Sequence, residues 1–202
     1  MKKLVALWDL GNVVVRWEPE TILTNFNCTA AETDFLRREL LGHDDWLRLD
    51  QGLITEQQFA ERICAISSMS MAKVLGCFDV VRASLIDIPE SVKLIRQMHD
   101  AQIPMYVLSN MSQENADMLK QREYFQCFDG VMISAEEKLI KPDPALFERV
   151  LNKYALNAGD LYFIDDSQPN IDTARSLGFK ARQFHRSSDC YRQIRKEFGL
   201  PG

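Results

Sequence analysis

Short apolar runs alternate with segments of helical length along most of this chain. Four of the runs are almost continuously apolar, and they cover residues 4–8, 105–108, 130–133 and 161–164. Continuous runs of this length are typical of strands that are buried on both faces, as in a parallel sheet. A fifth run, at 179–184, alternates apolar and polar residues, which indicates a strand at the edge of that sheet.

The segments between these runs have the length and the polarity pattern of helices. They cover residues 89–101, 112–122, 143–154 and 169–177. Asp143 and Pro144 mark the start of one of them, because Asp caps a helix and Pro suits its first position. The alternation of strands and helices predicts an α/β fold with a Rossmann-like parallel sheet.

Residues 18–85 break this alternation, because they carry helix signals and no clear strand. Two capping boxes mark helix starts in this segment, Thr29-x-x-Glu32 and Thr55-x-x-Gln58. The segment is too long to be a simple crossover between two strands. We therefore predict a helical cap at residues 18–85, inserted into a core that residues 1–17 and 86–202 form.

The composition excludes several classes of protein. With 46% hydrophobic and 26% charged residues, the 202-residue chain has the composition of a globular protein. Its 24 basic and 29 acidic residues give a net charge of −5 without long like-charge blocks, so we expect no nucleic-acid partner. No stretch approaches the ~18 apolar residues of a membrane helix, so we expect no membrane partner either. The sequence does not indicate an oligomeric state.

Cysteine usage and the N-terminal residues indicate a cytoplasmic protein. The five cysteines are odd in number and include no C-x-x-C pair, which favours reduced thiols over a disulfide framework. The apolar run that follows Met1-Lys2-Lys3 superficially resembles a secretion signal. Asp9 and Asn12 interrupt it too early, and no cleavage pattern follows.

Polar residues follow each of the four apolar runs at its carboxyl end. They are Asp9 after the first run, Ser109-Asn110 after the second, Lys141 a short loop after the third, and Asp165-Asp166 after the fourth. In open α/β sheets the binding crevice lies outside the carboxyl ends of the strands. We therefore expect these four regions of the sequence to meet at one site.

The residue types at this predicted site suit phosphate chemistry. Clustered carboxylates repel one another unless a cation intervenes, so Asp9, Asp165 and Asp166 indicate a divalent ion with oxygen ligands, most simply Mg²⁺. A carboxylate can attack phosphorus and form an aspartyl phosphate. Lys141 supplies a positive charge, and Ser109 supplies a hydrogen-bond donor for the phosphoryl oxygens.

These motifs together resemble those of the haloacid dehalogenase superfamily, specifically its phosphatase-like members with a helical cap after the first strand. In chain order they are Trp8-Asp9-Leu10-Gly11-Asn12-Val13, Leu108-Ser109-Asn110, Lys141-Pro142-Asp143-Pro144 and Phe163-Ile164-Asp165-Asp166-Ser167, followed by Asn170. Each motif is weak alone, but four in this order and in this strand context are specific.

The resemblance implies a role for each matching residue. It implies Asp9 as nucleophile, Ser109 as phosphate anchor and Lys141 as charge stabiliser. The implied metal ligands are Asp9, the backbone carbonyl of Gly11, Asp165 and Asp166. Asn110 and, in the cap, Trp46 are the further candidate substrate contacts, although Trp46 also fits an interpretation as core packing.

Gly11 departs from the pattern of most phosphatases in this superfamily. They carry a second aspartate two residues after the nucleophile, which acts as general acid and base. The D-L-G-N-V form resembles the branch that contains bacterial glucose-1-phosphate phosphatases, which similarly lack that acid. The glycine carbonyl still suits a metal, but proton transfer to the leaving group, commonly a 10²- to 10⁴-fold effect, has no evident source.

The sequence thus predicts a Mg²⁺-dependent phosphatase that acts on a small phosphorylated metabolite such as a sugar 1-phosphate. One alternative is a 2-haloacid dehalogenase of the same fold, which also uses an aspartate nucleophile but needs no metal and leaves Asp165 and Asp166 unexplained. A second alternative is a module that accepts phosphate or binds a protein without catalysis.

Overall fold

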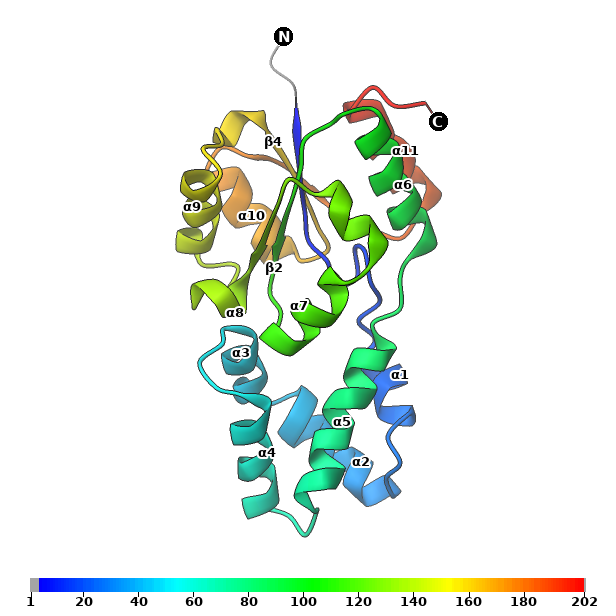
Figure 1. Ribbon diagram of the computed structural model, residues 1–202, viewed down its shortest axis with the longest axis vertical. Coiled ribbons are helices and arrows are strands. Elements are labelled where there is room, and N and C mark those ends of the chain that lie inside the picture. Colours follow the sequence, from blue (N-terminus) through cyan, green and yellow to red (C-terminus); the bar gives the residue numbers. More distant parts are fainter. Residues whose placement is uncertain (1–3, 202) are drawn as a thin grey trace.

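A five-stranded parallel sheet with helices around it forms the upper part of the molecule in Figure 1. The computed structural model describes residues 4–201, so residues 1–3 and 202, at the ends of the predicted core segments, lie outside the described residues. The strands are β1 (Val5–Trp8), β2 (Met105–Ser109), β3 (Gly130–Ile133), β4 (Leu161–Asp165) and β5 (Lys180–Gln183). Their order in the sheet is β3-β2-β1-β4-β5. The predicted Rossmann-like sheet is confirmed, with the alternating run at 179–184 at its edge.

Helices cover both faces of the sheet, which explains why the strands are almost continuously apolar. On one face, Ala6 and Trp8 pack with residues of α6 (Pro89–Asp100), α7 (Gln113–Lys120) and α11 (Ser188–Glu197). On the other face, Val5 and Leu7 pack with residues of α9 (Pro144–Lys153) and α10 (Gln168–Ser176). The core of the sheet is therefore divided into two apolar layers.

Local signals set the bounds of these helices. Asp143 caps α9 through a hydrogen bond from the Ala145 backbone N–H (2.9 Å), and Pro144 is the first helical residue, as predicted. Three shorter elements were not predicted, because they are too short to show a helical period; they are α8 (Ser134–Glu137) and the 3₁₀ helices Glu123–Cys127 and Ala158–Asp160.

Between β1 and α6 the chain is helical throughout. The elements are α1 (Pro19–Thr24), α2 (Ala30–Leu36), a π-helix (Arg37–Leu41), α3 (Asp44–Asp50), α4 (Glu56–Ala65) and α5 (Met71–Ser84). Both predicted capping boxes, at Thr29 and Thr55, are formed. We call these elements the helical insertion. They pack around their own apolar cluster, which includes Phe59 and Phe78, and lie beyond the carboxyl ends of the strands (Figure 1).

The chain enters and leaves the helical insertion along two adjacent segments. The Arg16 N–H donates to the Ile86 carbonyl (2.8 Å), and the Ile88 N–H donates to the Val14 carbonyl (2.8 Å). Val15 and Asp87 form an antiparallel bridge between these bonds. The two connections therefore form a short antiparallel ribbon close to the carboxyl end of β1.

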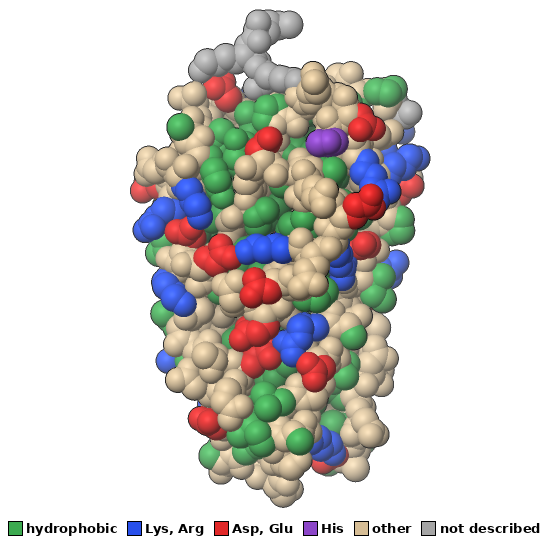
Figure 2. Space-filling model, viewed as in Figure 1, with side chains coloured by type: hydrophobic (Ala, Val, Ile, Leu, Met, Phe, Trp, Pro, Cys, Tyr) green, Lys and Arg blue, Asp and Glu red, His purple; other side chains and the backbone are tan. Residues whose placement is uncertain are grey.

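The surface carries charges of both signs. On the face that Figure 2 shows, Lys and Arg side chains lie beside Asp and Glu side chains rather than in one basic area. Ion pairs such as Lys120–Glu136 and Lys153–Glu137 contribute to this mixing. The absence of a nucleic-acid partner stays a prediction. No helix within residues 4–201 combines the length and apolarity needed to cross a membrane.

Candidate active site

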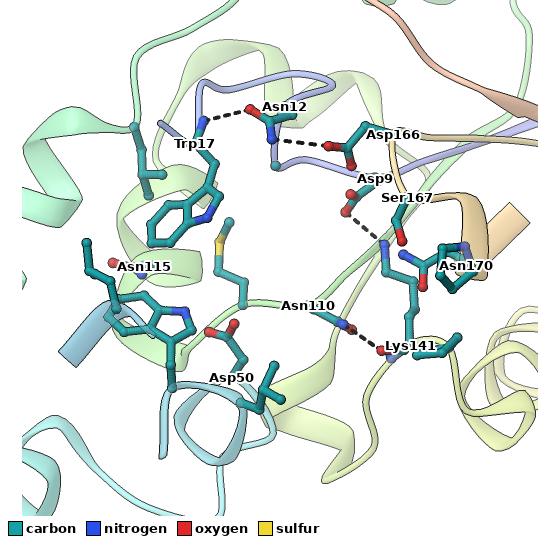
Figure 3. A pocket seen from close by; sticks show the side chains of 18 residues that line it. Asp9, Asn12, Trp17, Asp50, Asn110, Asn115, Lys141, Asp166, Ser167 and Asn170 are labelled. Carbon is teal, nitrogen blue, oxygen red and sulfur yellow. Dashed lines mark hydrogen bonds and ion pairs between the residues drawn. The ribbon is translucent and has the colours of Figure 1, made fainter. Parts of the chain in front are cut away.

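The predicted site residues converge because their strands are neighbours. Asp9 directly follows β1, which lies between β2 and β4. Ser109 ends β2, and Asp165 ends β4 with Asp166 next to it. Figure 3 shows Asp9, Asp166, Asn110 and Lys141 around one side of a cavity.

Lys141 lies at the centre of this group. Its Nζ is 2.9 Å from Asp9 Oδ1 and 2.7 Å from Asp165 Oδ2, and it donates to the Leu108 carbonyl at 2.9 Å. Three oxygens thus surround an ammonium that has three N–H donors. Burial alone would lower the pKa of Lys141, but the Asp165 and Asp9 carboxylates outweigh it and raise that pKa above its usual value. The lysine is therefore a fixed positive charge.

Asn110 holds the Lys141 backbone in place. Its Nδ2 donates to the Lys141 carbonyl (2.9 Å), and its Oδ1 accepts from the Lys141 N–H (2.8 Å). The two bonds use both ends of the amide and connect the end of β2 to the loop after β3. Lys138, by contrast, is exposed and its Nζ donates to the Gly52 carbonyl of the helical insertion.

The two adjacent aspartates have different surroundings. Asp165 is completely buried and accepts from Lys141, from the Ser167 N–H (2.8 Å) and from Asn170 Nδ2 at both oxygens (3.1 and 3.0 Å). Asp166 is only partly buried and accepts from Asn12 Nδ2 at 3.1 Å. Burial raises the pKa of Asp166 above its usual value. Asp165 therefore organises its neighbours, whereas Asp166 faces the cavity.

Three carboxylates fit a divalent cation at this position. Asp9, Asp165 and Asp166 each offer one oxygen, and these oxygens all lie within 4.8 Å of one another. Burial raises the pKa of Asp9 to about 7, although Lys141 opposes the increase. A hard divalent ion such as Mg²⁺ prefers oxygen ligands of this kind and removes the repulsion between them. The donor set therefore fits Mg²⁺.

Asn12 fixes Asp166 from the opposite side. Its φ of 55° lies in the left-handed region, which Asn tolerates better than most residues. In this conformation its Nδ2 reaches Asp166 and its Oδ1 accepts from the Trp17 N–H at 3.1 Å. Asn12 thus connects the loop after β1 with the loop after β4.

A cavity of about 520 Å³ extends from these charged residues to the helical insertion (Figure 3). Its far end, which we call the outer chamber, is mostly apolar; the lining residues there are Trp17, Leu41, Trp46, Leu47, Asp50, Leu85, Met111 and Asn115. Trp46 has its ring 5.2 Å from that of Trp17 and 6.2 Å from that of Phe78. It lines the cavity and also packs in the insertion's apolar cluster.

Residues 6–178 match the haloacid dehalogenase-like hydrolases. The chain belongs to this family. The match runs from β1 to just past the end of α10 and includes the helical insertion, so it covers every residue of the charged site.

Two relatives of this hydrolase come from Aspergillus species. A drimenol cyclase of Aspergillus calidoustus is 26% identical over 200 residues, which cover 96% of this chain and 36% of the cyclase. A sesquiterpene phosphatase of Aspergillus oryzae is 22% identical over 177 residues, which cover 86% of this chain and 85% of that protein. The hydrolase chain thus spans about a third of the cyclase and most of the phosphatase.

Solved structures share the fold of this hydrolase. A family enzyme from Bacteroides thetaiotaomicron, in complex with magnesium and inorganic phosphate, has a TM-score of 0.79 at 22% identity, covering 96% of this chain and all of its own. The L-2-haloacid dehalogenase of Xanthobacter autotrophicus has a TM-score of 0.69 at 13% identity, covering 98% of this chain and 83% of its own.

Ser109 and Gly11, two of the predicted site residues, differ in how closely they are surrounded. Ser109 is completely buried, and its Oγ has no hydrogen-bond partner among residues 4–201. Buried hydroxyls usually have a partner. The Ser109 hydroxyl lies close enough to Asp9 to lower the pKa of that carboxyl group, so it is placed beside the predicted nucleophile. Gly11 lines the cavity, and a Cβ added there would meet no atom within 4 Å.

Sequence reasoning missed three polar residues of this cavity. Asn12 belongs to the motif that contains Asp9, but its left-handed conformation is not visible in the sequence. Asp50 ends α3 and Asn115 lies in the first turn of α7. Each sits in a helix whose cavity-facing side depends on how the helical insertion packs on the sheet, so no local signal marks them.

Proposed function

We propose that this hydrolase is a Mg²⁺-dependent phosphatase that cleaves a small phosphate monoester through an aspartyl phosphate on Asp9. The observation that carries the proposal is the cluster of Asp9, Asp165 and Asp166 around the buried Lys141. Three carboxylates near one another need a cation, and a phosphoryl group that meets them needs one as well.

Asp9 is the nucleophile in this proposal. Lys141 holds Asp9 Oδ1, so Oδ2 is the oxygen that forms the bond to phosphorus while the bond from phosphorus to the leaving oxygen breaks. Water then attacks phosphorus, inorganic phosphate leaves and the carboxylate is restored. Lys141 Nζ already bonds to Asp9, Asp165 and the Leu108 carbonyl, so it supplies a fixed positive charge beside the phosphoryl group. The Ser109 hydroxyl donates to a phosphoryl oxygen as charge develops on it.

Asp9, Asp166 and the backbone carbonyl of Gly11 would hold the Mg²⁺ directly. When bound, the ion supplies neutralisation of the negative charge that substrate and carboxylates share. Asp165 is the further candidate ligand, but both of its oxygens already accept hydrogen bonds. We assign to it the orientation of Lys141 and Asn170.

The leaving group in this proposal is one that bears negative charge well. Gly11 provides no carboxyl group that would protonate the departing oxygen, so cleavage depends on the acidity of the leaving alcohol. An anomeric sugar hydroxyl is more acidic than an ordinary alcohol. A sugar 1-phosphate is therefore the first candidate substrate, which agrees with the resemblance of the D-L-G-N-V motif.

The monophosphate of a terpenoid alcohol is the second candidate substrate. The outer chamber is lined mostly by apolar side chains, among them Trp17, Trp46 and Met111. An apolar leaving group gains free energy when it enters such a chamber. The sesquiterpene phosphatase relative supports the same substrate class.

In both cases the helical insertion would act as a cap that selects the leaving group. Residues 18–85 would form this cap, and residues 1–17 and 86–202 the catalytic core. The cap provides Leu41, Trp46 and Leu47 to the outer chamber, while the core holds the phosphoryl group that all substrates share.

One experiment separates the phosphatase from its alternatives. Purified protein is incubated with phenyl phosphate and Mg²⁺, with and without excess EDTA, and separately with 2-chloropropionate. We expect phosphate release that stops in EDTA and no chloride release. Chloride release without phosphate release would establish a dehalogenase, and neither reaction would indicate a non-catalytic module.

A further inference from the structure

Asp50 is a carboxylate without a basic partner in an apolar environment. It lies at the end of α3, lines the outer chamber, and is directed into the cavity in Figure 3. No Lys, Arg or His within residues 4–201 forms an ion pair with it. The other acidic residues of the cavity, Asp9 and Asp166, contact Lys141 and Asn12.

Burial raises the pKa of Asp50 to about 7, and contacts with the Ser112 backbone and the Trp46 side chain oppose only part of this increase. An acidic group in such a position costs stability unless something donates to it. Structural acids are normally paired, so an unpaired acid that faces a cavity points to a ligand.

Asn115 provides a second, independent sign of a ligand. It is 95% buried, at 5% exposure, and lines the same chamber from the first turn of α7. Its carbonyl oxygen is completely buried and has no hydrogen-bond partner among residues 4–201. Its amide group makes no hydrogen bond that would hold it in place against a described side chain. One apolar chamber therefore holds a carboxylate without a basic partner, Asp50, and a buried carbonyl oxygen without a hydrogen-bond donor, Asn115 Oδ1.

We infer that Asp50 and Asn115 form a subsite for a hydrogen-bond-donating group, a hydroxyl or an ammonium, on the leaving group of the substrate. The inference rests on the proposed phosphatase function and narrows its substrate class. Among the residues that line the outer chamber, these two are the ones with polar side chains apart from the Trp indoles. A purely apolar leaving group would bury the Asp50 carboxylate further without offering it a donor, which is unfavourable.

The hydrogen-bond donor on the leaving group can be an ammonium or a hydroxyl, and the two respond differently to the charge of Asp50. An ammonium group would form a charge-assisted hydrogen bond with the carboxylate and would pack against the Trp17 and Trp46 rings as a cation. A neutral hydroxyl would use the same oxygen as an ordinary acceptor. Replacement of Asp50 by Asn keeps an acceptor oxygen and removes the charge.

The test compares kcat/KM for four substrates in the wild type and in Asp50→Asn. The substrates are glucose 1-phosphate, phosphoethanolamine, farnesyl phosphate and phenyl phosphate, the last serving as a reference without a donor. We expect the wild type to favour one of the two donor substrates over farnesyl phosphate. If the favoured substrate is phosphoethanolamine, Asp50→Asn should lower its kcat/KM, relative to that of phenyl phosphate, by about 10- to 100-fold. If it is glucose 1-phosphate, the same substitution should lower this relative kcat/KM by about 3-fold.

Two further variants make the result specific. Asn115→Leu should lower kcat/KM for the same donor substrate. Asp44→Asn, at the exposed start of α3, should leave the order of kcat/KM among the substrates unchanged. Farnesyl phosphate as the best wild-type substrate, with further improvement in Asp50→Leu, would overturn the inference while leaving the phosphatase proposal intact.

If no substrate is hydrolysed, the phosphatase proposal is contradicted. A binding measurement then still tests the subsite. Free ethanolamine or glucose at saturating concentration should raise the Tm of the wild type. In Asp50→Asn the ethanolamine shift should be lost, whereas a glucose shift should only be smaller, because the Asn oxygen still accepts a hydrogen bond. The absence of any shift with both compounds would overturn the subsite.

Discussion

The two ends of the cavity are built in opposite ways. At the phosphoryl end, charged side chains follow the strands of the sheet and hold one another, so that Lys141 contacts three oxygens. In the outer chamber, most walls are apolar and the one carboxylate, Asp50, has no basic partner among the described residues. The phosphoryl end suits the phosphoryl group, which all substrates share. The outer chamber suits the leaving group, which differs between substrates.

The strongest test of the phosphoryl end is the removal of the nucleophile. Asp9→Asn should lower kcat by at least about 10⁴-fold for every substrate, because an amide of the same size is a poor nucleophile. Initial rates of phosphate release measure the effect, with Asp44→Asn as the control. Turnover that survives in Asp9→Asn would show that another residue attacks phosphorus.

The next test concerns the ion at the same end. Asp166→Asn should raise the Mg²⁺ concentration for half-maximal rate by about 10-fold or more, with part of the rate recovered at high Mg²⁺. Titration of activity with Mg²⁺ measures this shift. An unchanged Mg²⁺ requirement would remove Asp166 from the metal site.

Gly11 lines the cavity close to Asp9 in the sequence and allows a gain-of-function test. The space around Gly11 admits a side chain. Gly11→Asp should therefore increase the cleavage rate of substrates with poor leaving groups by up to about 10²- to 10⁴-fold, and that of substrates with good leaving groups less. A series of aryl phosphates of graded acidity measures the dependence. A shallow dependence already in the wild type would mean that another residue protonates the leaving group, and the argument for an anomeric substrate would fail.

The outer chamber should respond to changes that leave the phosphoryl end intact. Trp46→Ala and the milder Trp46→Phe should alter the preference among sugar and terpenoid phosphates by about 10-fold, and alter phenyl phosphate hydrolysis less. Trp46 also packs on Phe78, so the milder variant protects against loss of folding. Equal losses for all substrates would reduce Trp46 to a packing residue.

The smallest expected effect is on stability. Burial raises the pKa of Asp50 in the folded state to about 7, well above the ordinary value of 3.8 for an aspartate, so the wild type loses stability as pH rises from about 4 to 7. Asp50→Asn should therefore raise Tm by a few degrees at pH 8, with a smaller gain at pH 5. Thermal unfolding at the two values measures this, and a larger gain at pH 5 would contradict it.

The same contrast explains how much the sequence predicts. Asp9, Ser109 and Asp165 directly end or follow apolar runs, and parallel strands bring their carboxyl ends to one edge, so the topology alone joins them. Lys141 is recognisable from the Pro-Asp-Pro context that follows it. The sheet and its helices follow from periodicity in the same way, as do the capped helices of the insertion.

Asp50, Asn115 and Asn12 are not predictable in this way. The cavity-facing side of α3 and α7 depends on how two separately packed apolar clusters meet, and that contact leaves no period in the sequence. A single Asp at a helix end close to Gly52 has the pattern of an ordinary helix terminus. The left-handed φ of Asn12 likewise occurs together with hydrogen bonds to residues distant in the sequence or in the following loop, which no local pattern indicates.

The antiparallel ribbon at Val15 and Asp87 has a consequence for protein engineering. Because the two strands of the ribbon are already hydrogen-bonded, a tight two-residue turn has the right span to replace everything between them. The helical insertion can be treated as a loop whose two ends are held together by the ribbon. The entropy cost of closing such a loop increases only slowly with its length. Helical modules of different size can therefore be exchanged at this point without moving β1 or the carboxylate that follows it.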